Sequence, residues 1–309
     1  MSGPTGRDVW RFVALSLLVL VALSIVADID RVSAAFGRFD WRLLPAVLGL
    51  TLLSIATRYL KWEYLLRVSG IDVPLRDSFV VFWSALVMVV SPGKVGDAWK
   101  SWQLRERRNI AVSESLPVVV MERVADLLSI LLLAIVGAQA ISRSVEVVAL
   151  LLLVLLTGVA VVRHEPTCLR LIELVGSLPY LGSHEVRLKR VYRSTLPMLR
   201  LPVLAAALSL SLVAYTFQTV SLLALVSGFG PPIRLSSAAF VFAVASVAGT
   251  FSFLPGGIGV TDGSMAVLLF SLGVGESTAV GTVILMRLTT TWFTVGTALP
   301  VWGYGYVRQ

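Results

Sequence analysis

Charged residues are scarce in this chain of 309 residues, where Asp, Glu, Lys and Arg together make up only 14%. An ordinary soluble domain carries roughly 25%. Hydrophobic residues make up 57% of the chain, which is more apolar surface than a water-soluble fold can hide. The composition therefore excludes a soluble enzyme and predicts an integral membrane protein.

Cysteine and histidine are almost missing as well. The single cysteine, Cys168, excludes an intramolecular disulfide, and His164 and His184 are too few for a usual Cys/His metal site. We predict no metal and no cofactor, and we interpret Cys168 as an inert buried or interfacial thiol.

Motifs of known enzymes are weak. Ser91-Pro92-Gly93-Lys94 matches a Ser-x-x-Lys pattern, but the chain has no Ser-Asp-Asn or Lys-Thr-Gly partner for it. No phosphate-binding Gly-x-x-x-x-Gly-Lys loop occurs. We predict no catalytic residue and expect that the chain is not an enzyme.

Long apolar blocks are abundant, and a helix needs about 20 such residues to cross about 30 Å of hydrocarbon. The clearest blocks are Phe12–Ala27, Leu43–Thr57, Leu116–Ala140, Val147–Val162, Val203–Ser227 and Thr278–Val301. The first is interpreted as a retained span, because five further spans favour an uncleaved helix over a secretory signal. The pattern predicts an all-α, polytopic bundle of membrane helices.

Basic residues gather in the loops that a cytoplasmic N-terminus would place inside the cell. This predicts a multi-pass protein of the cell (inner) membrane with both termini in the cytoplasm. Residues 164–200 form a basic, amphipathic cytoplasmic linker, and Arg58, Lys61 and Trp62 are interpreted as interfacial anchors. The net charge of +8 fits anionic lipid headgroups, so no nucleic-acid partner is expected.

Two segments of the chain, predicted at about 43–140 and about 203–305, form similar repeat halves. Each half contains one Pro-Gly turn. Basic clusters flank Ser78–Ser91, so this block is interpreted as half of a re-entrant hairpin, and Ser236–Leu254 as its counterpart opening to the other face. The predicted turn residues are Pro92, Gly93, Gly96, Pro255, Gly256, Gly257 and Gly259.

An arginine follows each turn at nearly the same distance along the chain. Arg123 comes 31 residues after Pro92, and Arg287 comes 32 residues after Pro255. Inverted repeats with broken helices are typical of secondary transporters. The alternative is that common Pro-Gly turns match by chance.

Charges inside the spans need partners, because each costs about 2.5–3.5 kcal/mol at the centre of a membrane helix. Arg123 and Asp126 share a helical face and form either a structural ion pair or part of a site. Arg287 requires a partner from another element: Asp262, Asp97, Glu122 or an anionic ligand.

A phosphate-bearing headgroup suits these basic residues, because arginine can hold phosphate bidentately and a lysine at the turn adds a point charge. The predicted substrate-binding residues are Lys94, Asp97, Glu122, Arg123, Asp126, Asp262 and Arg287. With four acids and three bases the set is nearly neutral, which favours a zwitterionic or aminoacylated headgroup whose ammonium contacts Glu122 or Asp262.

These motifs together resemble the flippase-like transmembrane family shared by lysylphosphatidylglycerol synthases of the MprF type, YbhN-type proteins and the membrane region of archaeal AglD. The resemblance covers roughly residues 10–305. Asp97 and Asp262 stand where the family usually has Glu, and Lys100 stands where Arg is usual. Each of these residues keeps the charge of the usual residue on a shorter side chain.

The resemblance implies a transporter that moves an anionic or zwitterionic lipid, a phospholipid or a polyprenyl-phosphate-linked sugar, between leaflets by alternating access. A membrane lipid is then the substrate, and a separate glycosyltransferase or lipid-modifying enzyme is the partner that the family suggests. Two alternatives stay open: a non-transporting scaffold for a lipid-modifying enzyme, and an ion-coupled transporter of a small anion.

Overall fold

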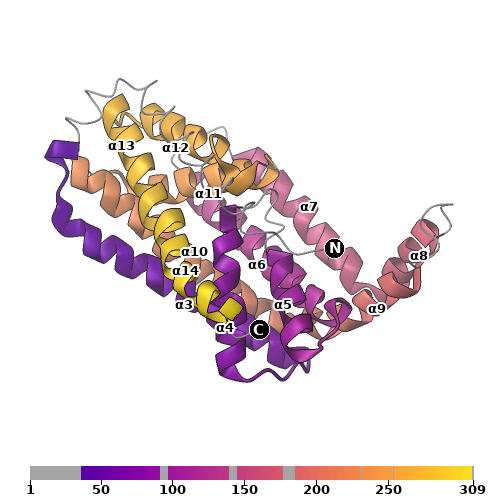
Figure 1. Cartoon of the computed structure of the whole chain (residues 1–309). Helices are drawn as coiled ribbons and strands as arrows, with labels where there is room; N and C mark the ends of the chain where they lie inside the picture. Colours follow the sequence, from indigo (N-terminus) through magenta and orange to yellow (C-terminus); the bar gives the residue numbers. More distant parts are fainter. Residues whose placement is uncertain are drawn as a thin grey trace.

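The fold is built from helices alone in the part of the chain that the computed structural model describes, which is residues 36–90, 97–138, 145–176, 185–230, 232–252 and 254–307 (Figure 1). Helices account for 89% of the structure. The all-α prediction is therefore confirmed. The first predicted span, Phe12–Ala27, lies outside the described residues.

The first half contains one long helix, a broken hairpin and a second long helix. Their bounds are α3 Leu44–Val68 after the short η1 Trp41–Leu43, α4 Leu75–Ala85 continued by the 3-10 turn η2 Leu86–Val90, α5 Ala98–Arg108 and α6 Val112–Ala138. The turn residues Pro92, Gly93 and Gly96, together with Lys94, lie outside the described residues.

Helix α3 is longer than the sequence predicted. It starts with Pro45 in its first turn and ends at Val68, before Gly70 at φ +71°. The predicted end at Thr57 is wrong, because the basic residues that follow Thr57 remain helical and turn into the bundle.

The second half repeats the order of elements. It comprises α10 Leu201–Phe229, α11 Leu235–Phe251, the short η6 Pro255–Gly257, α12 Val260–Ser271, and a last long helix made of α13 Glu276–Arg287, the π-helical turn η7 Leu288–Trp292 and α14 Phe293–Val307. Long helix, hairpin and long helix therefore occur twice along the described chain.

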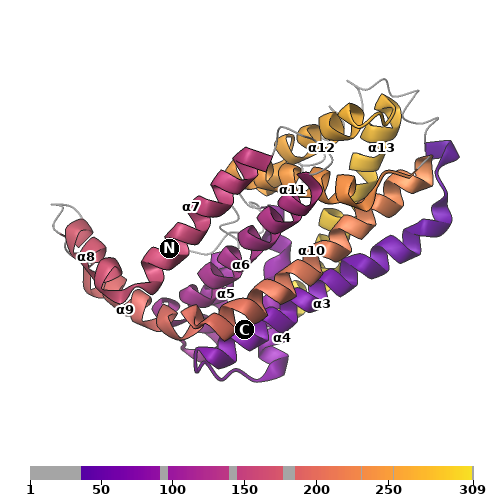
Figure 2. The same cartoon turned by 180° about the vertical axis from the view of Figure 1, so that it is seen from behind.

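Each half packs against elements of the other half. Helix α3 packs along α10, while the first arm of each hairpin packs on the last long helix of the other half, α4 on α14 and α11 on α6. The inner ends of the hairpins, η2 and η6, touch. Figures 1 and 2 show α4 and α5 near one end of the bundle and α12 and α13 near the other.

Close approach of α11 and α6 depends on Gly137. A Cβ there would lie 2.5 Å from the backbone nitrogen of Phe240 and 2.6 Å from the carbonyl oxygen of Ser236. The missing side chain lets the two helices meet backbone to backbone, as small residues do in membrane bundles.

Between the halves lie α7 Val145–Arg163, α8 Glu165–Gly176, α9 Glu185–Thr195 and the short η5 Leu196–Leu199. Figure 2 shows α7 running along one side of the bundle and α8 projecting away from it. The linker predicted at 164–200 is thus helical over its described residues except His164 and Arg200 at its two ends. Its cytoplasmic location stays a prediction.

Large apolar side chains cover the outside of several helices, for example Leu53 and Leu60 on α3, which are 51% and 58% exposed. Two described helices, Trp41–Val68 and Leu201–Phe229, are long and apolar enough to cross a membrane by length and composition. The two contain α3 and α10, which pack along each other with α3 at the edge of the bundle (Figure 1).

Candidate functional site

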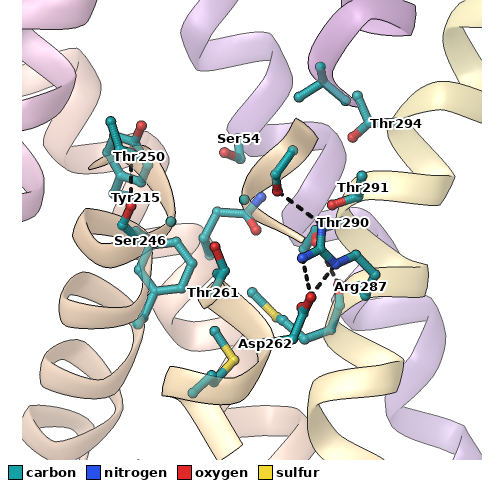
Figure 3. Close-up of a pocket in the computed structure, with 18 of the residues that line it drawn as sticks. Ser54, Tyr215, Ser246, Thr250, Thr261, Asp262, Arg287, Thr290, Thr291 and Thr294 are labelled. Atoms are coloured by element: carbon teal, nitrogen blue, oxygen red, sulfur yellow. Dashed lines mark hydrogen bonds and ion pairs between the residues drawn. The ribbon is translucent and has the colours of Figure 1, made fainter. Parts of the chain in front are cut away.

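A polar cavity of about 210 Å³ lies where the two halves meet. Its walls come from α3, η2 and α6 of the first half and from α10, α11, η6, α12, α13, η7 and α14 of the second. Figure 3 shows its polar side chains converging, with Ser246, Thr250 and Tyr215 on one side and Arg287, Thr290, Thr291 and Thr294 opposite. The cavity therefore collects residues that are far apart in the sequence.

Arg287 and Asp262 form a two-pronged ion pair in the cavity wall (Figure 3). The Arg287 Nε donates to Asp262 Oδ1 at 3.0 Å and Nη2 donates to Oδ2 at 2.5 Å, while Nη1 donates to the Gly256 carbonyl at 3.2 Å. Arg287 is 6% exposed and Asp262 4%. Of the partners that the sequence allowed for Arg287, the structure selects Asp262.

The glycine-rich turn gives Asp262 its position. Gly256, Gly257 and Gly259 have φ values of 58°, 64° and 81°. Residues with a Cβ rarely adopt such positive φ values. The Gly259 backbone N–H donates to Asp262 Oδ2 at 3.0 Å, so the carboxylate caps the first turn of α12 while it holds Arg287.

Thr261 packs tightly in the same hairpin. A Cβ on Gly249 of α11 would lie 1.8 Å from Thr261 Oγ1, and one on Gly257 would lie 2.5 Å from that oxygen. The hairpin therefore closes only because both positions lack a side chain.

Arg58 also lines the cavity. Its guanidinium lies 4.8 Å from the ring centroid of Tyr215, a cation–π distance. Its Nε is buried without a hydrogen-bond partner, and no carboxylate of the described residues forms an ion pair with it. The sequence-based interpretation of Arg58 as an interfacial anchor is wrong, because α3 continues past it and places its side chain on the cavity wall.

The remaining intramembrane charges form a second cluster, here called the α6 cluster, which does not line the cavity. Lys61 Nζ donates to Asp126 Oδ1 at 2.5 Å and to Ser211 Oγ at 2.7 Å, and Ser211 Oγ donates to the same carboxylate at 2.8 Å. Lys61 is 1% exposed and Trp62 is fully buried. The interpretation of these two residues as interfacial anchors is wrong, because they face the interior of the bundle.

Two further pairs complete the α6 cluster. Lys100 Nζ of α5 donates to Glu122 Oε2 at 2.5 Å, and Arg123 pairs with Asp97, the residue before α5. The alternative pair of Arg123 with Asp126 is also present, at the longer distance of 3.9 Å. These contacts tie the second arm of the first hairpin to α6.

The predicted site residues therefore separate into two groups. Asp262, Arg287, Gly256 and Gly257 line the cavity, whereas Asp97, Glu122, Arg123 and Asp126 belong to the α6 cluster. The positions of Glu122 and Asp126 on α6 do not by themselves reveal this separation, because their lysine partners come from α5 and α3.

Uncharged polar groups complete the cavity wall. Gln218 and Thr294 are each only 8% exposed, and neither side chain forms a hydrogen bond with any described residue. The hydroxyls of Ser246, Thr261 and Thr291 likewise line the cavity without a side-chain hydrogen bond to the described part of the chain. These side chains can both donate and accept hydrogen bonds, so they are available to a polar molecule in the cavity.

An apolar groove of about 350 Å³ lies beside the cavity. Val247 and Phe251 of α11 line the groove, and Ser246 and Thr250 of the same helix line the cavity. A single helix thus separates a polar compartment from an apolar one.

Fold and site together define a multi-pass helical membrane protein with a polar cavity inside the bundle. The chain belongs to the family described as the lysylphosphatidylglycerol synthase TM region, whose model matches residues 13–297. The resemblance inferred from the motifs is thereby confirmed.

Two relatives come from Methanothermobacter thermautotrophicus, and each is named a UPF0104 membrane protein. One is 27% identical over 303 residues, covering 91% of this chain and 89% of the relative. The other is 23% identical over 308 residues, covering 91% of this chain and 90% of the relative. The similarity extends over nearly the whole of each chain.

Proposed function

We propose that this protein moves a lipid with a phosphate-bearing headgroup between the two leaflets of the cell membrane, the headgroup passing through the cavity. The observation that carries the proposal is the position of Arg58 and Arg287 on a polar cavity inside an apolar helical bundle. Charge inside a membrane is costly and marks a transport pathway more often than a packing contact.

The chains of the lipid would stay outside the cavity. The groove along α11 is apolar and includes Phe251, which is 58% exposed. A lipid whose headgroup enters the cavity has an apolar surface for its acyl chain one helix away.

Alternating access between two inverted repeats is the mechanism we propose. The reciprocal packing of α4 on α14 and α11 on α6, and the contact between η2 and η6, support a two-fold relation between the halves. Hairpins entering from opposite ends would open the cavity to one side at a time. Both termini are then cytoplasmic, and a separate glycosyltransferase or lipid-modifying enzyme would supply the lipid.

The test is translocation in proteoliposomes. Phosphatidylglycerol with a fluorophore on one acyl chain is reconstituted, and the fraction reached by an impermeant quencher is followed over time. Arg58→Gln should lower the protein-dependent rate at least about tenfold, because a hydrogen bond to a charged group contributes about 1.5–3 kcal/mol. The matched control is Arg67→Gln on the same helix, where the side chain is 70% exposed.

Equal rates in wild-type, Arg58→Gln and protein-free liposomes would contradict the proposal and favour the scaffold. Uptake of soluble phosphate without lipid movement would instead favour a small-anion transporter.

A further inference from the structure

The charges on the cavity wall do not match an ammonium group. Two arginines, Arg58 and Arg287, and one carboxylate, Asp262, line the cavity, which leaves a net charge of +1. Both carboxylate oxygens of Asp262 already accept hydrogen bonds from Arg287, and one accepts a third from Gly259. No described carboxylate of the cavity is therefore free for a cation.

The acids of the α6 cluster are not available to an ammonium either. Glu122 and Asp126 do not line the cavity, and each lies 2.5 Å from a buried lysine. The sequence-based hypothesis of an ammonium on Glu122 or Asp262 thus loses both of its acceptors. A ligand with one negative charge complements the cavity instead.

The uncharged part of the wall points to hydroxyl groups. Gln218 and Thr294 are more than nine-tenths buried and have no side-chain partner among the described residues. An amide or a hydroxyl both donates and accepts, as a hydroxyl of the ligand does. Together with Ser246, Thr261 and Thr291 these groups could satisfy several hydroxyls at once.

The cavity is also small. Its volume of about 210 Å³ is below the range of roughly 300–1,000 Å³ that is usual for pockets of drug-sized ligands. It accommodates one compact headgroup and not an oligosaccharide.

We propose that the cavity selects a headgroup made of one phosphodiester and neutral hydroxyl groups, of the phosphoglycerol or phosphate-linked monosaccharide class, over headgroups that carry an ammonium. Arg58, beside Tyr215, binds the phosphodiester, and Gln218 and Thr294 bind the hydroxyls. This inference rests on the proposed function only in taking the ligand to be a lipid, whose headgroup enters the cavity while its acyl chains stay outside.

The experiment measures binding in detergent by calorimetry with three dihexanoyl lipids. Phosphatidylglycerol has the phosphodiester and the hydroxyls, phosphatidylmethanol has the same charge without hydroxyls, and phosphatidylethanolamine carries an ammonium. Phosphatidylglycerol should bind about tenfold more tightly than phosphatidylmethanol, because two hydrogen bonds contribute that much, and phosphatidylethanolamine should bind more weakly than both.

Variants separate the two parts of the cavity. Gln218→Leu and Thr294→Val should remove the advantage of phosphatidylglycerol over phosphatidylmethanol and leave phosphatidylmethanol binding unchanged. Arg58→Gln should weaken both anionic lipids by a similar factor. Thermal unfolding of each variant shows that the protein is folded, so a loss of binding is specific.

Several results would overturn the inference. Phosphatidylethanolamine binding as tightly as phosphatidylglycerol, or a hydroxyl preference that survives both Gln218→Leu and Thr294→Val, contradicts the assigned class. Soluble glycerol phosphate binding as tightly as the short-chain lipid shows a site for a soluble anion. The expected order of affinities without translocation refutes the proposed function and leaves this inference standing, because binding is measured without transport.

Discussion

Arg287 donates two hydrogen bonds to the carboxylate of Asp262, which lies 25 residues earlier in the chain. The same arginine donates a third hydrogen bond to the carbonyl of Gly256 in the hairpin turn. One side chain thus holds the turn, the start of α12 and the long helix α13 together. Arg287 therefore both lines the cavity and stabilises the hairpin. Its replacement should affect both lipid transport and the stability of the fold.

Arg287→Gln alone should destabilise the protein by about 3–5 kcal/mol, because it leaves the buried Asp262 carboxylate without its counter-ion. The double variant Arg287→Gln with Asp262→Asn should regain most of the stability and still translocate poorly. Thermal unfolding in detergent beside the liposome assay measures both. If the double variant is active, Arg287 is only structural.

Lys61→Met should lower the free energy of unfolding by a similar amount, about 3–5 kcal/mol, because the buried carboxylate of Asp126 would lose its lysine partner. Adding Asp126→Leu should restore stability to near the wild-type value. Ser211→Ala serves as the milder comparison, with an expected loss of about 1 kcal/mol for one hydrogen bond. Wild-type stability of Lys61→Met would place that lysine outside the bundle, contrary to its contacts.

Gly249→Ala should destabilise the second hairpin, because the new Cβ would meet Thr261 Oγ1 at 1.8 Å. Thr261→Ala removes that oxygen, so the double variant should be more stable than Gly249→Ala. Gly263→Ala is the control, since a Cβ at that position would have no neighbour within 4 Å, and it should be neutral or stabilise α12 by about 0.5–1 kcal/mol. Equal effects of Gly249→Ala and Gly263→Ala would refute the close approach.

Cys168 should react slowly with maleimide at neutral pH. The side chain is half-buried, and this partial burial raises the pKa of its thiol, while the thiolate is the reactive form. The labelling rate should therefore keep rising as the pH increases through about 9, and it should stay below that of an exposed cysteine introduced by Arg67→Cys in a Cys168→Ser background. Equal rates at neutral pH would contradict the raised pKa of the Cys168 thiol.

Composition and local pattern determine several features directly. Long apolar runs with few charges require helices, because backbone groups in hydrocarbon must be hydrogen-bonded within their own segment. Pro255 and the glycines after it interrupt a helix wherever they occur. The cost of Arg123 and Arg287 within spans likewise marks both as residues that need a partner, whatever the fold.

Only the tertiary structure decided which partner each charge received. Lys61 stands near the end of an apolar run, where the sequence pattern of an interfacial anchor and that of a buried base are the same. Packing of α3 against α6 and α10 brings it within 2.5 Å of Asp126 and 2.7 Å of Ser211. Ion pairing depends on distances of a few ångströms between helices far apart in the chain, and helix packing sets those distances.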